Sequence, residues 1–205
     1  MNGKSAPLDV GGATLWSGFL DRDAQETMVA ALREVVASAP LFSPETRLGK
    51  PMSVRMTSAG RYGWYSDRSH GYRYETRHPA GVDWPPIPRP VLDVWATVAP
   101  EARLPDACLV NFYGEGARMG LHQDRDEADF TQPVVSISLG DEGLFRIGGT
   151  ERGGPTQSVW LRSGDVLVLG GAARLAHHGV DRIKFGSSTL LREGGRINLT
   201  LRVVD

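Results

Sequence analysis

The sequence predicts a mainly β protein with flanking helices, built on an antiparallel sandwich or jelly roll. After Pro105, short apolar runs of strand length alternate with Gly/Asp turns, and no helical periodicity separates them. The 205 residues, with 40% hydrophobic and 23% charged residues, suit one soluble domain with a full core. We therefore expect a single domain over 1–205, with an N-terminal part over about 1–90 and a β core over about 105–205.

The N-terminal part begins with a short strand and one amphipathic helix. Residues 14–16 are apolar and read as the strand. Asp23-x-x-Glu26 resembles a capping box, and apolar residues at helical spacing then continue to Pro40. A second helix is expected over 91–98, after a proline-rich stretch.

Strands account for most of the remaining chain. Residues 51–84 read as β-hairpins with Gly60, Gly63 and Gly71 at the turns. The β core is expected to contain strands at 107–113, 133–139, 143–148, 157–162, 165–169 and 196–204. This spacing without intervening helices favours antiparallel pairing.

Although the net charge of the whole chain is only −1, one segment is strongly basic and rich in aromatic residues. Residues 46–89 contain three acidic and eight basic residues, a net charge of +5. The basic residues are Arg47, Lys50, Arg55, Arg61, Arg68, Arg73, Arg77 and Arg89. The same segment holds Tyr62, Trp64, Tyr65, Tyr72, Tyr74 and Trp84. Cations interleaved with aromatic rings suit single-stranded nucleic acid, whose phosphates meet arginines and whose bases stack on rings. The alternative is a loop-rich β region with inward-packed rings and solvated arginines.

Cellular location and assembly are constrained by what the sequence lacks. No apolar run approaches the ~20 residues of a membrane helix, and the N-terminus has no signal-peptide pattern. The single Cys108 excludes an internal disulfide, agrees with a reducing cytoplasm and lies in an apolar run that predicts a buried thiol. Neither heptads nor long apolar surfaces demand a partner, so we expect a cytoplasmic monomer without membrane contact.

A candidate metal site is formed by His122-Gln-Asp124 together with the distal His178-Gly179. Two imidazoles and one carboxylate can occupy one face of an octahedral metal and leave the opposite positions open, as in non-haem Fe(II) oxygenases. An H-x-D pair alone arises by chance in roughly a third of such chains, so the neighbouring residues must decide.

The last strand carries polar residues at alternate positions. Strand periodicity separates Ile197, Leu199, Leu201 and Val203 from Arg196, Asn198, Thr200 and Arg202. The polar side can simply face solvent. Alternatively, Arg196 and Arg202, roughly 20 Å apart along a straight strand, can hold the two ends of a dicarboxylate, with Asn198 between them. An iron triad beside such a clamp points to 2-oxoglutarate.

The chain resembles the bacterial AlkB-type Fe(II)/2-oxoglutarate-dependent dioxygenases, which repair alkylated nucleic acid by oxidative demethylation. The motifs that carry this resemblance cover residues 50–204 in order and the first 45 more loosely. They are Met52-Ser-Val-x-Met-Thr57, Gly63-Trp64, Gly71-Tyr72-x-Tyr74, Asp106-Ala-Cys-Leu-Val-Asn111-Phe-Tyr113, Leu121-His122-Gln-Asp124-Arg-Asp126-Glu, Pro133-Val-Val-Ser-Ile-Ser-Leu-Gly140, Phe145-x-x-Gly148-Gly149, Gly164-Asp165-Val, Arg174-Leu-x-x-His178-Gly179 and Arg196-x-Asn198-Leu-Thr-x-Arg202.

The resemblance implies a double-stranded β-helix (jelly roll) core with an N-terminal nucleotide-recognition extension. It assigns Fe(II) to His122, Asp124 and His178. It assigns 2-oxoglutarate to Asn111, Tyr113, Arg196, Asn198 and Arg202, and substrate contacts to Trp64, Tyr72, Tyr74, Asp126 and Arg152. Two of these residues have simpler explanations, since Asp126 can be a solvated turn carboxylate and Arg152 an exposed loop arginine.

His177 precedes the distal iron ligand, where the family usually has a residue other than histidine. Adjacent strand residues face opposite ways, so only one of the two imidazoles can bind the metal. The following Gly179 and the spacing from Arg174 favour His178. His177 is then expected to support the site or to lie at the surface.

The function implied by the resemblance is oxidative demethylation of bases such as 1-methyladenine and 3-methylcytosine. The expected substrate is alkylated DNA, preferably single-stranded, with RNA as a further substrate. The enzyme would consume 2-oxoglutarate and O2 as co-substrates of Fe(II) and release succinate and formaldehyde. Two alternatives remain open at this point: a tRNA- or RNA-modifying oxygenase on the same scaffold, and a non-catalytic nucleic-acid-binding β-domain.

Overall fold

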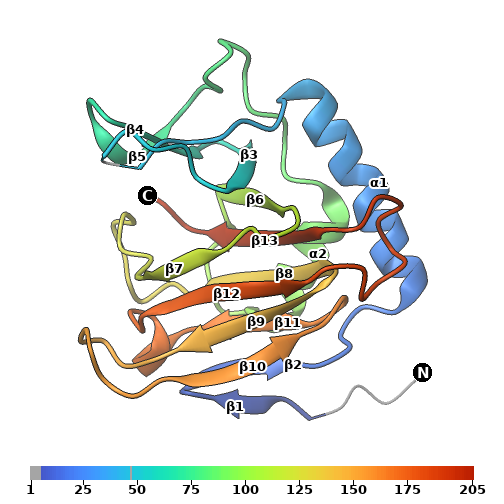
Figure 1. Ribbon diagram of the computed structural model, residues 1–205, viewed down its shortest axis with the longest axis vertical. Coiled ribbons are helices and arrows are strands. Elements are labelled where there is room, and N and C mark those ends of the chain that lie inside the picture. Colours follow the sequence, from blue (N-terminus) through green and yellow to red (C-terminus); the bar gives the residue numbers. More distant parts are fainter. Residues whose placement is uncertain (1–5, 47) are drawn as a thin grey trace.

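The computed structural model describes residues 6–46 and 48–205 (Figure 1). Arg47, one of the basic residues noted above, lies outside the described residues. The described strands form two facing antiparallel sheets and a separate hairpin. The predicted mainly β fold with flanking helices and a jelly-roll core is confirmed.

The larger sheet, which we call the major sheet, contains seven of the described strands. Its order is β1-β2-β11-β8-β13-β6-β3. The bounds are β1 Leu8–Val10, β2 Ala13–Trp16, β3 Val54–Gly60, β6 Ala107–Tyr113, β8 Val134–Gly140, β11 Val166–Leu169 and β13 Arg196–Arg202. The central strand β13 pairs with β6 on one side and β8 on the other, which buries its backbone hydrogen bonds.

The smaller sheet, the minor sheet, has the order β10-β9-β12-β7 among the described residues. Its strands are β7 Met119–His122, β9 Glu142–Ile147, β10 Gln157–Leu161 and β12 His178–Lys184. Phe145 and Ile147 of β9 face the major sheet and join a shared core with Leu167 and Leu169 of β11. The two sheets therefore enclose one interior.

Helices α1 (Arg22–Ser38) and α2 (Arg89–Val98) pack on the other side of the major sheet. Their buried side chains, including Leu32 and Trp95, join one core with Leu199 and Leu201 of β13. The apolar half of β13 thus faces the helices. Its polar half must face the minor sheet rather than solvent.

The start of α1 differs from the prediction. Asp21, not Asp23, is the N-cap, and its carboxylate accepts a hydrogen bond from the Ala24 N–H at 2.9 Å. The predicted capping box was therefore wrong by two residues. Asp23 instead lies in the first helical turn, where a negative charge is favourable beside the helix N-terminus.

The predicted hairpin is formed by β4 (Gly63–Asp67) and β5 (Gly71–Glu75), which extend beyond the major sheet (Figure 1). Gly71 has a φ of +70° at its turn, as expected for glycine. Gly63 has a packing role, since a Cβ there would lie 2.2 Å from the Trp84 ring. Trp84 thereby supports the hairpin from below.

Two further expectations can be compared with the structure. Cys108 is fully buried, as predicted, and burial raises the pKa of its thiol to about 12. Among the described residues, neither helix has the length and apolar character needed to cross a membrane.

Candidate active site

A cavity of about 680 Å³ lies between the two sheets and opens beneath the β4–β5 hairpin. Eleven of the sequence-predicted site residues line it: Trp64, Tyr72, Asn111, Tyr113, His122, Asp124, Asp126, His178, Arg196, Asn198 and Arg202. The fold therefore brings side chains from both sheets and the hairpin to one place. Tyr74 and Arg152 are not among its lining residues.

The candidate metal ligands converge where β7 and β12 pair. His122 and His178 are register partners, with ring centroids 4.6 Å apart. Asp124 follows β7 and places its carboxylate oxygens 3.8 Å from His122 Nε2 and 3.7 Å from His178 Nε2. One ligand atom from each residue lies within 4.8 Å of the others, a spacing that fits a single ion.

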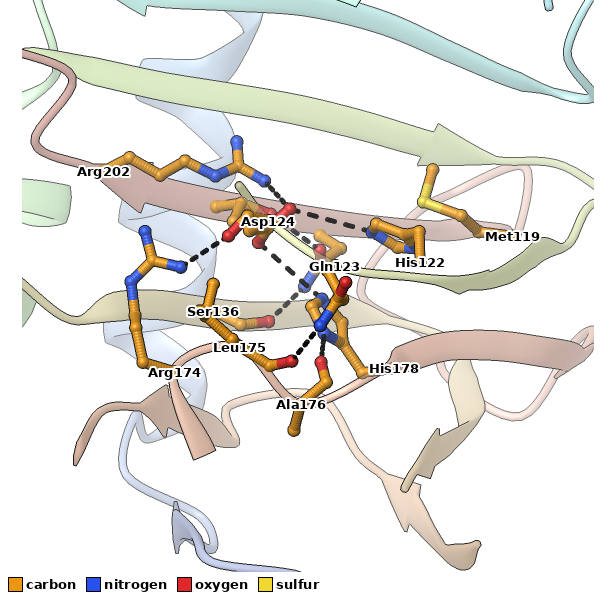
Figure 2. A network of polar contacts seen from close by, with 12 residues as sticks. Met119, His122, Gln123, Asp124, Ser136, Arg174, Leu175, Ala176, His178 and Arg202 are labelled. Carbon is orange, nitrogen blue, oxygen red and sulfur yellow. Dashed lines mark hydrogen bonds and ion pairs between the residues drawn. The ribbon is translucent and has the colours of Figure 1, made fainter. Parts of the chain in front are cut away.

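Both imidazoles are oriented for metal binding by backbone carbonyls. The Nδ1 atom of His122 lies 2.9 Å from the Gly120 carbonyl oxygen. The Nδ1 atom of His178 lies 2.9 Å from the Ala176 carbonyl oxygen (Figure 2). Donation from Nδ1 to a carbonyl leaves the Nε2 lone pair free for a metal. Asp124 Oδ2 is buried without a hydrogen-bond partner among the described residues, although an orphaned buried carboxylate oxygen is costly. The residues present thus fit a bound Fe(II).

Burial and neighbouring charges keep His178 and Asp124 in the protonation states that a metal requires. Burial lowers the pKa of His178 to about 4, so its imidazole is neutral at physiological pH. Burial alone would raise the pKa of Asp124, but the Arg202 guanidinium and the two imidazoles more than offset it. The pKa of Asp124 therefore lies well below its ordinary value, and the carboxylate is ionised.

A buried ionic network behind Asp124 was not predicted. Arg202 Nη2 donates to Asp124 Oδ1 at 2.8 Å, and its Nε lies 3.1 Å from Glu127 Oε1. Arg174 donates to Glu127 Oε2 at 3.0 Å and to the Asp124 carbonyl oxygen at 2.7 Å. The sequence offered only the positions of these residues as a sign of their role. Glu127 comes shortly after the H-x-D motif, and Arg174 lies four residues before His178.

Tyr74 belongs to this network. Its hydroxyl donates to Glu127 Oε1 at 2.6 Å, and burial raises the pKa of that hydroxyl well above 10. The side chain therefore connects β5 to the loop that carries Asp124. Arg152, by contrast, is exposed on the loop after β9.

The residues assigned to 2-oxoglutarate surround the polar face of β13. Arg196 is fully buried and donates to Ser138 Oγ at 2.7 Å, while its Nε lacks a partner among the described residues. Asn198 donates to Ser136 Oγ at 2.7 Å. Arg202 Nη1 and Asn111 Oδ1 are also buried without described partners. The unpaired arginine nitrogens are buried donors that a carboxylate ligand would satisfy, whereas Asn111 Oδ1 is an acceptor and needs a donor.

Tyr113 stands close to these groups and is buried on β6. Among the described residues its hydroxyl has only the weak acceptor Met119 Sδ, 3.8 Å away. Burial raises the pKa of Tyr113 to about 12, so the phenol remains a hydrogen-bond donor.

Trp64 and Tyr72 form the roof of the cavity at its exposed end. Their ring centroids are 5.3 Å apart with an interplanar angle of 31°. Trp64 Nε1 donates to Asp126 Oδ2 at 3.3 Å, which ties the ring to the loop after the H-x-D motif. Asp126 is exposed and lines the cavity, so it is available to a substrate.

The motif residues Gln123 and Gly179 hold the two ligand-bearing segments together. Gln123 Nε2 donates to the Leu175 carbonyl at 2.6 Å (Figure 2). It also donates to the Thr150 carbonyl at 3.1 Å. A Cβ at Gly179 would lie 2.6 Å from the Met119 carbonyl oxygen, so only glycine lets β7 approach β12 here. His177 is also buried, but its Nδ1 lies 3.2 Å from the Gly149 carbonyl oxygen. It does not belong to the cluster of His122, Asp124 and His178.

Comparisons with known proteins agree with this geometry. Residues 12–202 match the model of the 2OG-Fe(II) oxygenase superfamily. The chain is 56% identical over 194 residues to an alpha-ketoglutarate-dependent dioxygenase AlkB homolog of Caulobacter vibrioides, covering 94% of this chain and 88% of that protein. It is 38% identical over 185 residues to the alpha-ketoglutarate-dependent dioxygenase AlkB of Escherichia coli, covering 88% and 85%.

A solved structure has the same fold. The structure of OsALKBH1 superimposes with a TM-score of 0.77 at 33% sequence identity, covering 96% of this chain and 98% of that one. The chain therefore belongs to the 2OG-Fe(II) oxygenase superfamily and, within it, to the AlkB-type Fe(II)/2-oxoglutarate-dependent dioxygenases, whose Fe(II), 2-oxoglutarate and O2 it requires.

Proposed function

We propose that this enzyme removes methyl groups oxidatively from alkylated bases, such as 1-methyladenine and 3-methylcytosine, in DNA and also in RNA, with a preference for single strands. The observation that carries the proposal is the position of the Trp64–Tyr72 ring pair and Asp126 at the exposed end of a cavity whose floor is the His122–Asp124–His178 cluster. The relatives in Caulobacter vibrioides and Escherichia coli are AlkB proteins, which supports a nucleic-acid substrate.

His122, Asp124 and His178 would hold Fe(II), and the buried polar groups of β6 and β13 would hold 2-oxoglutarate. When bound, the iron with 2-oxoglutarate and O2 supplies an oxidant that hydroxylates the methyl group, after which formaldehyde leaves and the base is restored. Arg196 and Arg202 each keep a buried donor free for a carboxylate of the co-substrate. Asn111, Tyr113 and Asn198 add polar contacts around it.

The base would enter between the hairpin and the H-x-D loop. A base in a duplex cannot reach a buried site, so it must be extruded or already unpaired, and stacking on Trp64 and Tyr72 offsets part of that cost. Methylation at N1 of adenine or N3 of cytosine makes the base cationic, and the carboxylate of Asp126 favours that charge. Arg152, on the exposed loop after β9, is proposed to contact the nucleic-acid backbone near the opening.

Tyr74 takes a different part in this proposal. Its hydroxyl already donates to Glu127, and Glu127 supports Arg202. We assign Tyr74 to the placement of the hairpin over the site, with any contact to the base made by the edge of its ring.

The test is formaldehyde release from matched oligonucleotides. The enzyme with Fe(II), 2-oxoglutarate and O2 should release formaldehyde from 1-methyladenine or 3-methylcytosine in single-stranded DNA, and more slowly from the same lesion in a duplex. The same lesions in RNA and in a modified tRNA test the RNA-modifying alternative. Succinate formation without formaldehyde from every methylated oligonucleotide would contradict the proposed function.

A further inference from the structure

A second cavity of about 630 Å³ lies on the outer face of the minor sheet. We call it the minor-sheet groove, and its lining residues are Arg118, Met119, Gly120, Leu144, Arg146, Val180, Asp181 and Arg182. Phe145 and Ile147 of β9 point into the interior, so the alternate residues Leu144 and Arg146 point outward. The groove therefore crosses β7, β12 and β9, which are neighbours in the sheet (Figure 1).

The minor-sheet groove adjoins the active-site cavity at β7 and β12. Four residues line both spaces: Arg118, Met119, Gly120 and Val180. The groove therefore lies beside the cavity that would receive the base.

The groove is positively charged, with three arginines against one carboxylate. Arg146 Nη1 lies 3.4 Å from Asp181 Oδ2, and Arg146 Nε is buried without a hydrogen-bond partner among the described residues. The Arg182 guanidinium lies over the Trp160 ring at 5.6 Å. Within the described part of the chain, no carboxylate pairs with Arg118 or Arg182.

The basic segment 46–89 differs from the groove in this respect. Four of its arginines already have carboxylate partners: Arg61 with Asp205, Arg73 with Asp67, Arg77 with Asp83 and Arg89 with Asp93. Much of the positive charge that the sequence places near the hairpin is thus offset by the protein itself. The arginines of the groove have fewer carboxylate partners than the arginines of the basic segment, so they are more available to an external anion.

We propose that the minor-sheet groove binds the phosphodiester backbone of the strand whose methylated base occupies the cavity. This inference rests on the proposed function. Guanidinium groups bind phosphate oxygens in a bidentate manner, and their charge releases condensed counterions from the nucleic acid. Neighbouring strands are about 4.8 Å apart. Arg118, just before β7, Arg182 on β12 and Arg146 on β9 can therefore contact successive phosphates. DNA and RNA share this chemistry.

The direct test compares the Arg146→Ala/Arg182→Ala variant with the wild type in binding a single-stranded oligonucleotide of about 15 nucleotides that carries one methylated base. Losing two phosphate contacts should make the slope of log Kd against log salt concentration shallower by about 1.4 and weaken binding roughly tenfold at low salt. The matched control is Arg33→Ala/Arg192→Ala, which removes two exposed arginines outside both cavities. That control should retain the wild-type slope.

Substrate length separates groove binding from damage to the active site. Formaldehyde release from a methylated trinucleotide, too short to occupy the groove, should stay within about twofold of wild type in the Arg146→Ala/Arg182→Ala variant. Only the kcat/KM of the long oligonucleotide should fall. Equal loss on both substrates would overturn the inference, as would an unchanged salt slope.

A charge-increasing variant guards against misfolding as an explanation. Asp181→Asn removes the carboxylate beside Arg146 and should steepen the salt slope and tighten binding of the long DNA or RNA strand. Unaltered or weaker binding would contradict the inference. Failure of the wild type to release formaldehyde from any oligonucleotide would instead contradict the proposed function, since the binding slopes remain measurable in either case.

Discussion

At the scale of single residues, the two carboxylate oxygens of Asp124 have different roles. Its Oδ1 accepts from Arg202, while its Oδ2 is buried and free beside the two imidazoles. The contact with Arg202 restrains the side chain, and Oδ2 is left available to a metal. The combination orients the free oxygen toward the ion before the metal binds.

Glu127→Gln should weaken metal binding without removing a ligand. The neutral amide leaves Arg202 and Arg174 with less compensating charge in a buried site, which costs roughly 1–3 kcal/mol in the free energy of unfolding. Misplacement of Asp124 should weaken Fe(II) binding roughly 10–100-fold. Urea unfolding and anaerobic Fe(II) titration measure the two effects, with the exposed Glu193→Gln as control. Wild-type affinity in the Glu127→Gln variant would refute the positioning role.

Tyr74→Phe should separate a positioning tyrosine from a base-stacking one. The variant keeps the ring but loses the hydrogen bond to Glu127, so stability should fall by about 1 kcal/mol. If Tyr74 acts through Glu127, Fe(II) affinity should fall while KM for a methylated oligonucleotide stays close to wild type. Tyr72→Ala, which removes half of the ring pair, should mainly raise that KM. The opposite pattern in steady-state kinetics would reassign Tyr74 to the base.

At the scale of elements, the site depends on how closely β7 approaches β12. The two ligand histidines are cross-strand partners, and the irregular register beside them leaves the Met119 and Gly120 carbonyls over Gly179. The histidine–glycine pair in the sequence is therefore a packing requirement of the metal site. In the proposed metal site, Gly179 provides the room and His178 provides a ligand.

Gly179→Ala should abolish Fe(II) binding through a backbone shift. The added Cβ would lie within 2.6–2.9 Å of three β7 backbone atoms, and real Cβ atoms do not approach backbone so closely. Gly120→Ala is the matched control, because a Cβ there would have no neighbour within 4 Å. Metal titration should show loss of affinity in the first variant only. Equal behaviour of the two variants would contradict this account.

Sequence pattern predicted some elements better than others, for physical reasons. β6 is buried on both faces and the polar–apolar alternation of β13 is regular, so both were recognisable from the sequence. β1, β7 and β12 were missed because each is short, irregular or carries a polar outer face. The cluster of His122, Asp124 and His178 could be anticipated from the motifs, and the structure brings these residues together. The Glu127–Arg174 pair could not, because charged residues near a turn usually remain solvated.

At the scale of the whole molecule, β13 lies between the two helices and the minor sheet. One face of the strand packs in the core, and the other face lines the active-site cavity. Leu199 and Leu201 complete the core against the helices, while Arg196 and Arg202 face the cavity. Along β13 the inter-sheet interior can then contain charge, because the apolar side chains of this strand are buried on its opposite face.

Cys108 reports on the integrity of that core. Its thiol is fully buried and burial raises its pKa to about 12, so thiolate is scarce at neutral pH. The native enzyme should react with a thiol reagent only as fast as it opens, and complete modification should require denaturant. Fe(II) with 2-oxoglutarate, each at 100 times its Kd, should slow the reaction further, since ligands that bind only the folded state stabilise it. Rapid labelling of the native enzyme would contradict the described packing.

The central claim is that His122, Asp124 and His178 form the metal site of a demethylase. Anaerobic addition of Fe(II) and 2-oxoglutarate should produce a weak visible charge-transfer band in the wild type, followed by formaldehyde release from a 1-methyladenine oligonucleotide when O2 is admitted. His178→Ala and Asp124→Ala should lose both signals, while His177→Ala, whose imidazole lies outside the ligand cluster, should retain them. Retention of both signals in His178→Ala and Asp124→Ala would show that the site has been misassigned.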